Sequence, residues 1–513
     1  IAPLEAQQQQ QLPPLPPLGQ SEPPALQFQV YPGGTGAYLE RLARERGRAA
    51  FERAPFAVEP WSGPVPTAEE DVVFLPVHRL AALIQSRKIS SVTLTELYLT
   101  RLKRLDPKLL CAVTIMEGPA KEAAQQADAE IRNGRYRGPL HGIPWGVKDL
   151  FATKGVRTTW GSKDFENQVI DTDAEVVVRL RDAGAVLIAK LATGLFAQGD
   201  NWFRGQTKNP WNLAQGSSGS SAGPASATAA GCVAFGIGTE TQGSIVSPTI
   251  RCGLSALRPT FGRVSRYGGM VLAWSMDKVG PICRTIEDCA LVFNTIHGAD
   301  EKDPATVMAP FQFERNADLR KFRIGYDDRA PKEFVDQLRE LGADPKPMPA
   351  RPDSRSVSTL GVESAAAFDY WVTTWPPEPA DSIAMRADTA GRGRGGGRGG
   401  RGGGGGTRAR FSRGRSVTAL EFLQSQRRRL ILMQKMAELM KDYDMYVSGS
   451  GDVGLTNQTG HPAVVLPYSF GEGETAQPLC TTIIGDLFAD DKILSVAHRY
   501  QSVTDYHLKR PKV

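Results

Sequence analysis

The stretch QGSSGSSAGPASATAAGCVAFGIGTETQGSI, residues 215–245, gives the strongest indication of the fold. Small residues over 221–231 favour a closely packed helix, and the apolar run 233–237 favours a buried strand directly after it. The strand pattern then breaks into glycines and leads to Ser244. A helix followed at once by a buried strand is typical of α/β proteins.

The same order of elements recurs upstream. Residues 172–175 are expected to cap a helix over 176–180, which Gly184 ends before the strand-like run 185–189. Apolar residues at three- and four-residue steps over 72–106 predict two packing helices, and a long helix is expected from Thr418 to about Tyr443. Its arginines Arg427, Arg428 and Arg429 are expected to face solvent. The chain is therefore assigned to the α/β class.

Length and composition suggest one large domain with two low-complexity segments. The chain has 513 residues, of which 41% are hydrophobic, and no apolar run is long enough to span a membrane. Residues 1–26, rich in Gln and Pro, are predicted to be a disordered tether, residues 27–70 an N-terminal extension, and residues 71–513 the folded domain. Such a tether suits a periplasmic or secreted protein slightly better than a cytoplasmic one.

The positive charge is concentrated in one insert. Residues 391–415 hold eight arginines, thirteen glycines and no acid, which exceeds the whole formal excess of +6. We expect this insert to be a flexible loop, and the rest of the chain offers no basic field that would attract nucleic acid. The six cysteines and the histidines show no metal-ligand spacing, so neither a metal nor another cofactor is expected.

Three segments contain residues suited to chemistry. Lys148 lies in the apolar and glycine-rich run HGIPWGVKDL, residues 141–150, where a desolvated lysine can act as a neutral base. Serines cluster over 217–221. Backbone N–H groups at Thr241, Gln242, Gly243 and Ser244 can converge on an anion, as an oxyanion hole requires.

Together these segments resemble the amidase signature family. Lys148, Ser220 and Ser244 follow one another at intervals of 72 and 24 positions, and the similarity extends over about residues 74–508. The resemblance implies a single domain with a mixed β-sheet flanked by helices. It also implies that Ser244 is the nucleophile that forms an acyl-enzyme, Ser220 the bridging serine after a cis peptide bond, and Lys148 the base.

This constellation predicts an amidase that hydrolyses a small-molecule carboxylic amide to an acid and ammonia or an amine. The proton of Ser244 is expected to pass through Ser220 to Lys148. Gly219 eases the turn, and Ser221 is expected to support the relay by hydrogen bonding. Ser217 remains an alternative bridging serine, because both Gly-Ser-Ser triplets fit locally.

Two positions depart from the family pattern. Gln242 stands where relatives commonly have glycine, and Val246 where they have arginine. Either the packing around the loop is altered, or Arg251 takes over the role of the missing arginine. The substrate pocket is expected in residues 190–206 and 355–425, with the aromatic residues Trp202, Phe203, Phe368, Tyr370 and Trp371 as candidates.

Other functions stay open at this stage. Residues 219–223 also satisfy G-x-S-x-G, which would make Ser221 a nucleophile served by His461 or His498. Within the family, the chain is also similar to the glutamine-hydrolysing component of a tRNA-dependent amidotransferase, which works in a complex. A third hypothesis is RNA binding through the insert 391–415, although it lacks interleaved aromatics and nucleic acid is not the expected partner. The protein is expected to be a monomer or a homodimer.

Overall fold

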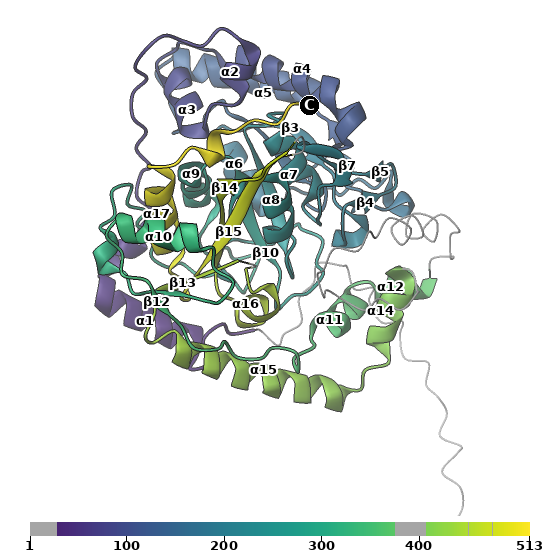
Figure 1. Cartoon of the computed structure of the whole chain (residues 1–513). Helices are drawn as coiled ribbons and strands as arrows, with labels where there is room; N and C mark the ends of the chain where they lie inside the picture. The colour runs from purple at the N-terminus through teal and green to yellow at the C-terminus, as the bar shows by residue number, and fades with distance from the viewer. Residues whose placement is uncertain (1–27, 375–406, 450, 474–475) are drawn as a thin grey trace, which may run out of the picture.

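The computed structural model describes residues 28–374, 407–449, 451–473 and 476–513. Its centre is an eleven-stranded sheet with helices on both faces (Figure 1). In chain order the strands of this sheet are β1 Ala112–Ile115, β2 Pro144–Lys148, β3 Val186–Leu191, β8 Phe235–Glu240, β9 Ser255–Arg258, β10 Lys278–Cys283, β11 Ile324–Tyr326, β12 Lys346–Pro347, β13 Met445–Ser448, β14 Ala463–Phe470 and β15 Pro478–Gly485.

The sheet is mixed, which confirms the predicted fold class. Its strand order is β1-β3-β2-β8-β10-β9-β14-β15-β13-β11-β12. Strand β2 runs parallel to both β3 and β8, whereas β10, β9, β14 and β15 pair antiparallel with their neighbours. Two short ribbons lie outside this sheet: β4 Asn201–Trp202 with β5 Gly205–Gln206, and β6 Lys208–Asn209 with β7 Asn212–Gly216.

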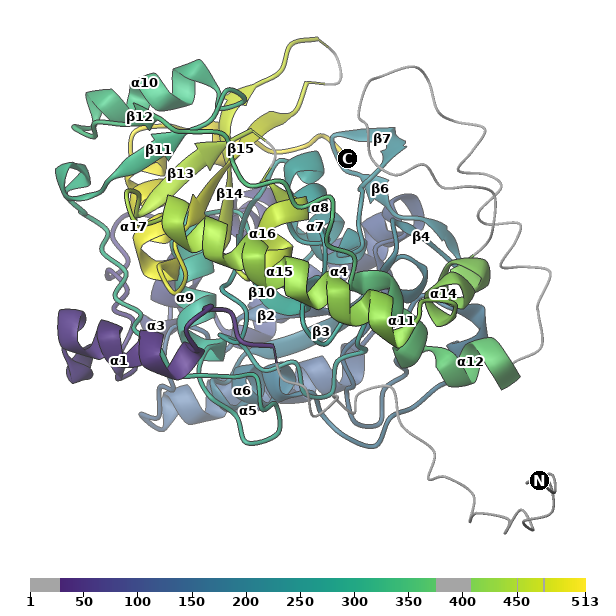
Figure 2. The same cartoon turned by 90° about the horizontal axis from the view of Figure 1, so that it is seen from below.

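The described helices surround the sheet. They are α1 Thr35–Arg46, α2 Glu69–Val73, α3 Val77–Gln85, α4 Ser91–Leu109, α5 Glu117–Arg132, α6 Glu175–Asp182, α7 Ala222–Ala229, α8 Val246–Cys252, α9 Ile286–Ile296, α10 Lys332–Glu340, α11 Leu360–Ala367, α12 Asp369–Thr374, α14 Thr407–Arg415, α15 Ala419–Leu439, α16 Val453–Thr459 and α17 Asp490–Gln501. Figure 2 shows α15 running across the molecule in front of α16. None of the described helices combines the length and apolar character that a bilayer crossing requires.

Alternating side chains of the central strands serve opposite faces of the sheet. Ala256 and Ile282 pack with residues of α7 and α8, whereas their chain neighbours Leu257 and Cys283 pack in the cluster that contains α9 and α17. Strands buried on both faces read as continuous apolar runs, which is why 233–237 shows no alternation. Helix α7 consists of small residues because it lies close to β8, β2 and β3.

The predicted helices 72–106 correspond to α2, α3 and α4, and the long helix corresponds to α15 with a Thr418–Glu421 capping box. The predicted cap of α6 is wrong. Ala174 is its N-cap residue without a side-chain hydrogen bond, because the Asp173 carboxylate accepts the Lys154 N–H instead and also pairs with Arg181.

Arg429 is a further correction, because its side chain is buried rather than solvated. Its guanidinium donates to the carbonyl oxygens of Gln458 and Ser275. Arg427 and Arg428 of the same run are exposed, as predicted. Three successive positions of a helix cannot share one face, so at least one arginine of the run turns away from the other two.

The predicted low-complexity segments are only partly described. Residues 1–26 and 391–406 lie outside the described residues. The prediction of a flexible insert over 391–415 fails at its end, because Thr407–Arg415 form helix α14 and Phe411 is buried against Phe368. In the predicted extension 27–70, Tyr38 and Leu42 of α1 pack with Phe261 and Phe488 of the main body.

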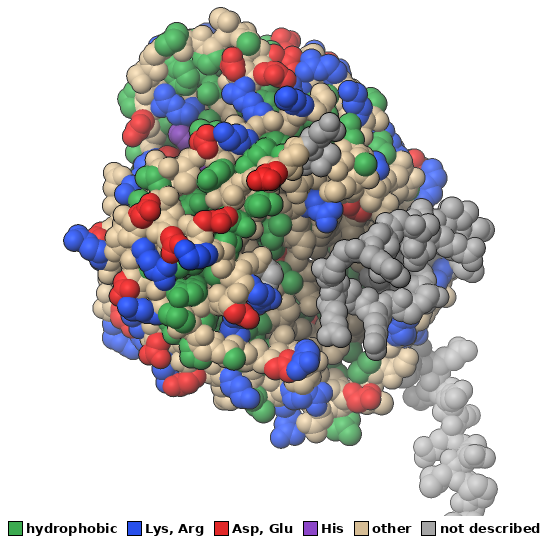
Figure 3. Space-filling model, in the orientation of Figure 1, with side chains coloured by type: hydrophobic (Ala, Val, Ile, Leu, Met, Phe, Trp, Pro, Cys, Tyr) green, Lys and Arg blue, Asp and Glu red, His purple; other side chains and the backbone are tan. Residues whose placement is uncertain are grey.

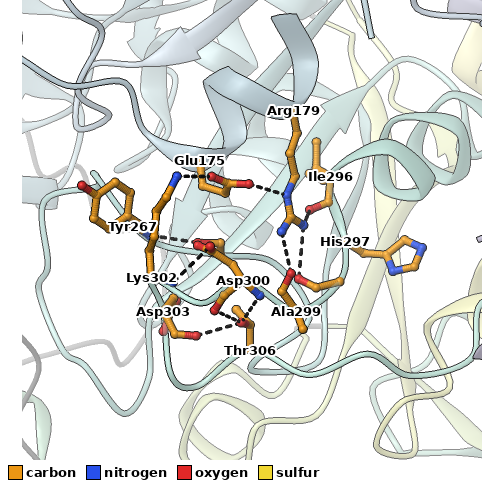
Figure 4. A network of polar contacts seen from close by, with 12 residues as sticks. Glu175, Arg179, Tyr267, Ile296, His297, Ala299, Asp300, Lys302, Asp303 and Thr306 are labelled. Carbon is orange, nitrogen blue, oxygen red and sulfur yellow. Dashed lines mark hydrogen bonds and ion pairs between the residues drawn. The ribbon is translucent and has the colours of Figure 1, made fainter. Parts of the chain in front are cut away.

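A polar network fixes the loop after α9 (Figure 4). Arg179 of α6 donates to the carbonyl oxygens of Ile296 and Ala299 and pairs with Glu175, which also binds Lys302. The same loop presents Asp303 to Arg266, at 2.7 Å. The segment that follows Arg266 is thereby held where it approaches the candidate site.

Candidate active site

The three predicted catalytic residues come from two neighbouring strands and a helix start. Lys148 is the last residue of β2, and Ser244 follows the end of β8 by four residues. Because β2 and β8 are parallel and adjacent, both chain segments leave the sheet at the same edge. Ser220 stands two residues before α7, which packs on both strands.

Lys148 is fully buried and hydrogen-bonded to hydroxyl groups. Its Nζ lies 2.7 Å from Ser220 Oγ and 2.8 Å from Thr239 Oγ1. Burial lowers the pKa of Lys148 well below its usual value of 10.5, and the negative charges of Asp277 and Glu240 only partly oppose this. A neutral amine can accept a proton, so the environment suits a base.

Ser220 follows a cis peptide bond at Gly219–Ser220, as the resemblance implies. The backbone of Gly199 lies against Gly219, where an added Cβ would come within 1.9 Å of the Gly199 carbonyl oxygen. Only glycine fits this close approach. Ser217, the alternative bridging serine, instead donates its hydroxyl to the Ser218 carbonyl oxygen.

Ser221 connects the two serine-bearing loops. Its backbone N–H donates to the Ser244 carbonyl oxygen at 3.1 Å, and its hydroxyl donates to Thr239 O and accepts from Thr239 N. These bonds hold the segment around Ser220 against the segment around Ser244. The predicted supporting role of Ser221 has a direct geometric counterpart here.

The segment Thr241 to Ser244 turns sharply between β8 and α8. Gly243 has a φ of 96°, which glycine adopts without strain, and Ser244 is partly exposed while Gln242 is exposed. Within the described residues, the backbone N–H groups of Gln242, Gly243 and Ser244 donate to no protein acceptor. Three free donors in one turn can bind an oxyanion.

The missing arginine of the family pattern is not replaced by Arg251, which is exposed. Arg258 of β9 takes a position in the site instead, because its Nη1 lies 2.9 Å from Glu240 Oε1 and its Nη2 donates to His461 O. Val246 is buried. Sequence reasoning missed Arg258, although it belongs to one of the motifs that carry the resemblance.

The five aromatic pocket candidates do not gather in one place. Phe368 and Trp371 pack with Phe196 and Phe411 in an aromatic cluster that includes Leu150, two residues after Lys148. Trp202 and Phe203 pack against each other and Val113 instead, and Tyr370 is 66% exposed on α12. Phe196, which sequence reasoning did not select, joins the two predicted pocket segments.

Neither histidine of the Ser-His hypothesis reaches Ser221 in the described residues. The hydroxyl of Ser221 is bonded to Thr239, His461 bonds to Thr459, and His498 packs on Phe313. Burial, with a smaller contribution from Arg258, lowers the pKa of His461 to about 3. In addition, β7 before Gly219 is largely exposed rather than buried.

Comparison with known proteins gives one consistent result. The model of the Amidase family matches residues 93–451. The A chain of the glutamyl-tRNA(Gln) amidotransferase of Methylococcus capsulatus is 34% identical, with 84% of this chain and 97% of the relative covered. A peptide amidase from Stenotrophomonas maltophilia has a TM-score of 0.71 at 27% identity, with 85% and 98% covered. An amidase family protein from Bacillus anthracis has a TM-score of 0.73 at 26% identity, with 87% and 94% covered.

Proposed function

Because the chain belongs to the amidase signature family, we propose that it hydrolyses a carboxylic amide with Ser244 as nucleophile, Ser220 as relay and Lys148 as base. The observation that carries this proposal is the buried amine of Lys148, hydrogen-bonded at 2.7 Å to the hydroxyl of Ser220. A serine hydroxyl is too weak an acid to attack an amide without a base.

In the first half-reaction, Ser244 Oγ forms a bond to the amide carbonyl carbon. Its proton passes to Ser220 Oγ, which gives its own proton to Lys148 Nζ. The carbonyl oxygen becomes an oxyanion, for which Gln242, Gly243 and Ser244 offer backbone N–H groups. When the C–N bond breaks, the leaving nitrogen takes a proton back along the same path, and the acyl group stays on Ser244.

In the second half-reaction, a water molecule attacks the acyl carbon and gives up a proton to Lys148 through Ser220. The bond to Ser244 Oγ then breaks, and the proton returns to that oxygen. The products are a carboxylic acid and a regenerated enzyme. Every proton transfer uses groups of this chain, and the protonation state of Lys148 is restored at the end of the cycle.

The substrate is open between two hypotheses. The sequence predicts a free-standing amidase, and the peptide amidase neighbour agrees with that reading. The curated relatives, which are named as the A chain of glutamyl-tRNA(Gln) amidotransferase, support a glutaminase component more strongly, since this chain covers 97% to 98% of several of them. In that case the amide is glutamine, the released ammonia is transferred onward, and the chain works in a complex.

Labelling and a substrate panel test these proposals together. We expect a fluorophosphonate to modify Ser244, as mass mapping of the labelled peptide would reveal, and Ser244→Ala to abolish labelling. Label on Ser221, or none, would contradict the mechanism. Release of ammonia from glutamine, but not from peptide amides or anilides, together with a larger assembly after mild purification, would favour the glutaminase component. The opposite pattern with a monomer or homodimer would favour the free-standing amidase.

RNA binding is the weaker alternative. It depends on residues 391–415, of which only the last nine are described, and these form a helix. On the face shown in Figure 3, basic and acidic side chains of the described residues are interspersed without a basic patch. If deletion of 391–406 leaves any RNA binding unchanged, the insert has no part in it.

A further inference from the structure

Asp277 holds the beginning of the nucleophile loop, residues 241–244. It stands directly before β10, and its Oδ1 accepts the hydroxyl of Thr241 at 2.5 Å. Its Oδ2 accepts the N–H groups of Leu272 and Ala273 at 2.8 and 3.1 Å. Within the described residues no cation lies within 4.0 Å of this carboxylate, although it is 8% exposed.

Glu240 holds the other end of the same loop. Its Oε2 accepts the N–H groups of Ile245 and Val246 at 2.8 and 2.9 Å, directly after Ser244. Its Oε1 is bound by Arg258 and by Asn457 of α16. The carboxylate thus has four donors and no exposure, and its pKa is lowered to about 2 despite burial, with Arg258 the largest lowering influence.

Both carboxylates also act on the amine of Lys148. They are the two charged groups that oppose the effect of its burial, Asp277 the more strongly. The charge of Glu240 is largely compensated by Arg258, and the second buried lysine at this edge, Lys278, directs its Nζ to the Met276 carbonyl oxygen. Asp277 therefore supplies the less compensated negative charge next to the relay.

We propose that Asp277 and Glu240 are positioning residues that fix the two ends of the nucleophile loop, and that Asp277 also stabilises the ammonium that forms on Lys148 when Ser244 attacks. The inference rests on the proposed function. A fixed carboxylate that faces the base costs no reorganisation when charge develops, which is the condition for electrostatic stabilisation of a transition state. The bond from Asp277 to Thr241 aligns the free N–H groups at the same time.

Three variants separate the charge of Asp277 from its hydrogen bond. The readout is the rate of fluorophosphonate labelling at Ser244 as a function of pH, whose acid limb reports protonation of Lys148. Asp277→Asn removes a negative charge, so we expect a slower plateau rate and an acid limb about one pH unit lower. Thr241→Val removes only the hydrogen bond, so the plateau should fall on the order of tenfold while the limb stays in place. Glu240→Gln should slow labelling, and Glu240→Asp should restore part of the rate.

Asp490→Asn is the matched control. Asp490 is equally buried and accepts a threonine hydroxyl and backbone N–H from Thr260, but it lies on α17 and does not act on Lys148. If Asp277→Asn moves the acid limb no further than this control, or if Thr241→Val labels as fast as wild type, the inference is overturned. If wild type itself is not labelled at Ser244, the proposed function fails first. Circular dichroism of each variant identifies loss of rate that comes from misfolding, in which case Thr241→Val, the least disruptive change, decides.

Discussion

The Nζ of Lys148 and the Oγ of Ser220 lie 2.7 Å apart, although 72 positions of sequence separate the two residues. Neither side chain is exposed to solvent. A charged ammonium would need more acceptors than this site offers, whereas a neutral amine can accept the proton of the hydroxyl. The contact therefore links a base to a relay group before any substrate arrives.

The two candidate bridging serines should differ sharply on substitution. Ser220→Ala removes the hydroxyl bonded to Lys148, and we expect amide hydrolysis to fall on the order of a hundredfold or more. Ser217→Ala removes only a bond to the neighbouring carbonyl oxygen and should retain most of the activity. Steady-state kinetics of the two variants on the same amide measures this, and the reverse ranking would assign the relay to Ser217.

Activity should fall at acid pH because Lys148 must be neutral. Its pKa is lowered by burial, so the neutral form persists well below pH 10.5, and activity should decline as pH drops through the folded-state pKa. Lys148→Ala should reduce the rate on the order of 10² to 10⁴-fold. A pH profile of kcat/KM is the measurement, and the residual activity of Lys148→Ala should lack the acid limb of wild type. A shared limb would place the titrating group elsewhere.

Lys148 should also cost stability. The unfolded chain binds a proton at this lysine below pH 10.5 while the folded chain does not, so wild-type stability rises with pH between the folded and unfolded pKa values. Lys148→Met should therefore raise the free energy of unfolding at pH 7, by ~1 kcal/mol. Urea unfolding at pH 7 and near pH 10 tests this. The gain should shrink at the higher pH, and a loss of stability at both would show that the hydrogen bonds of Lys148 outweigh its desolvation.

Gly219 should tolerate no side chain. An added Cβ would lie 1.9 Å from the Gly199 carbonyl oxygen, a backbone atom that cannot turn away. We expect Gly219→Ala to lower the free energy of unfolding by about 3 kcal/mol and to remove activity. Gly118→Ala, in α5 with no atom within 4 Å of the new Cβ, serves as control and should be neutral or stabilising by about 0.5–1 kcal/mol. Equal effects in thermal and urea unfolding would refute the steric explanation.

Local sequence pattern determined much of the architecture. Apolar periodicity located α3, α4, α15, β3 and β8, because burial on one face or on both leaves a regular imprint on the chain. Helix ends were less certain. The cap of α6 and the helix α14 depend on which side chain wins a competition for a backbone N–H, or on an aromatic residue such as Phe411 finding a buried partner, and neither is encoded in the local pattern.

The sequence by itself determined which residue types were available for chemistry: a lysine in an apolar segment, serines beside glycines, and a turn with free N–H groups. Only the tertiary structure decided that Lys148 meets Ser220 rather than Ser217, that Arg258 rather than Arg251 binds Glu240, and that Asp277 reaches Thr241. The physical reason is strand order. These residues lie on strands and loops that become neighbours when β2, β8, β10 and β9 pair side by side, and sequence distance carries no information about that pairing.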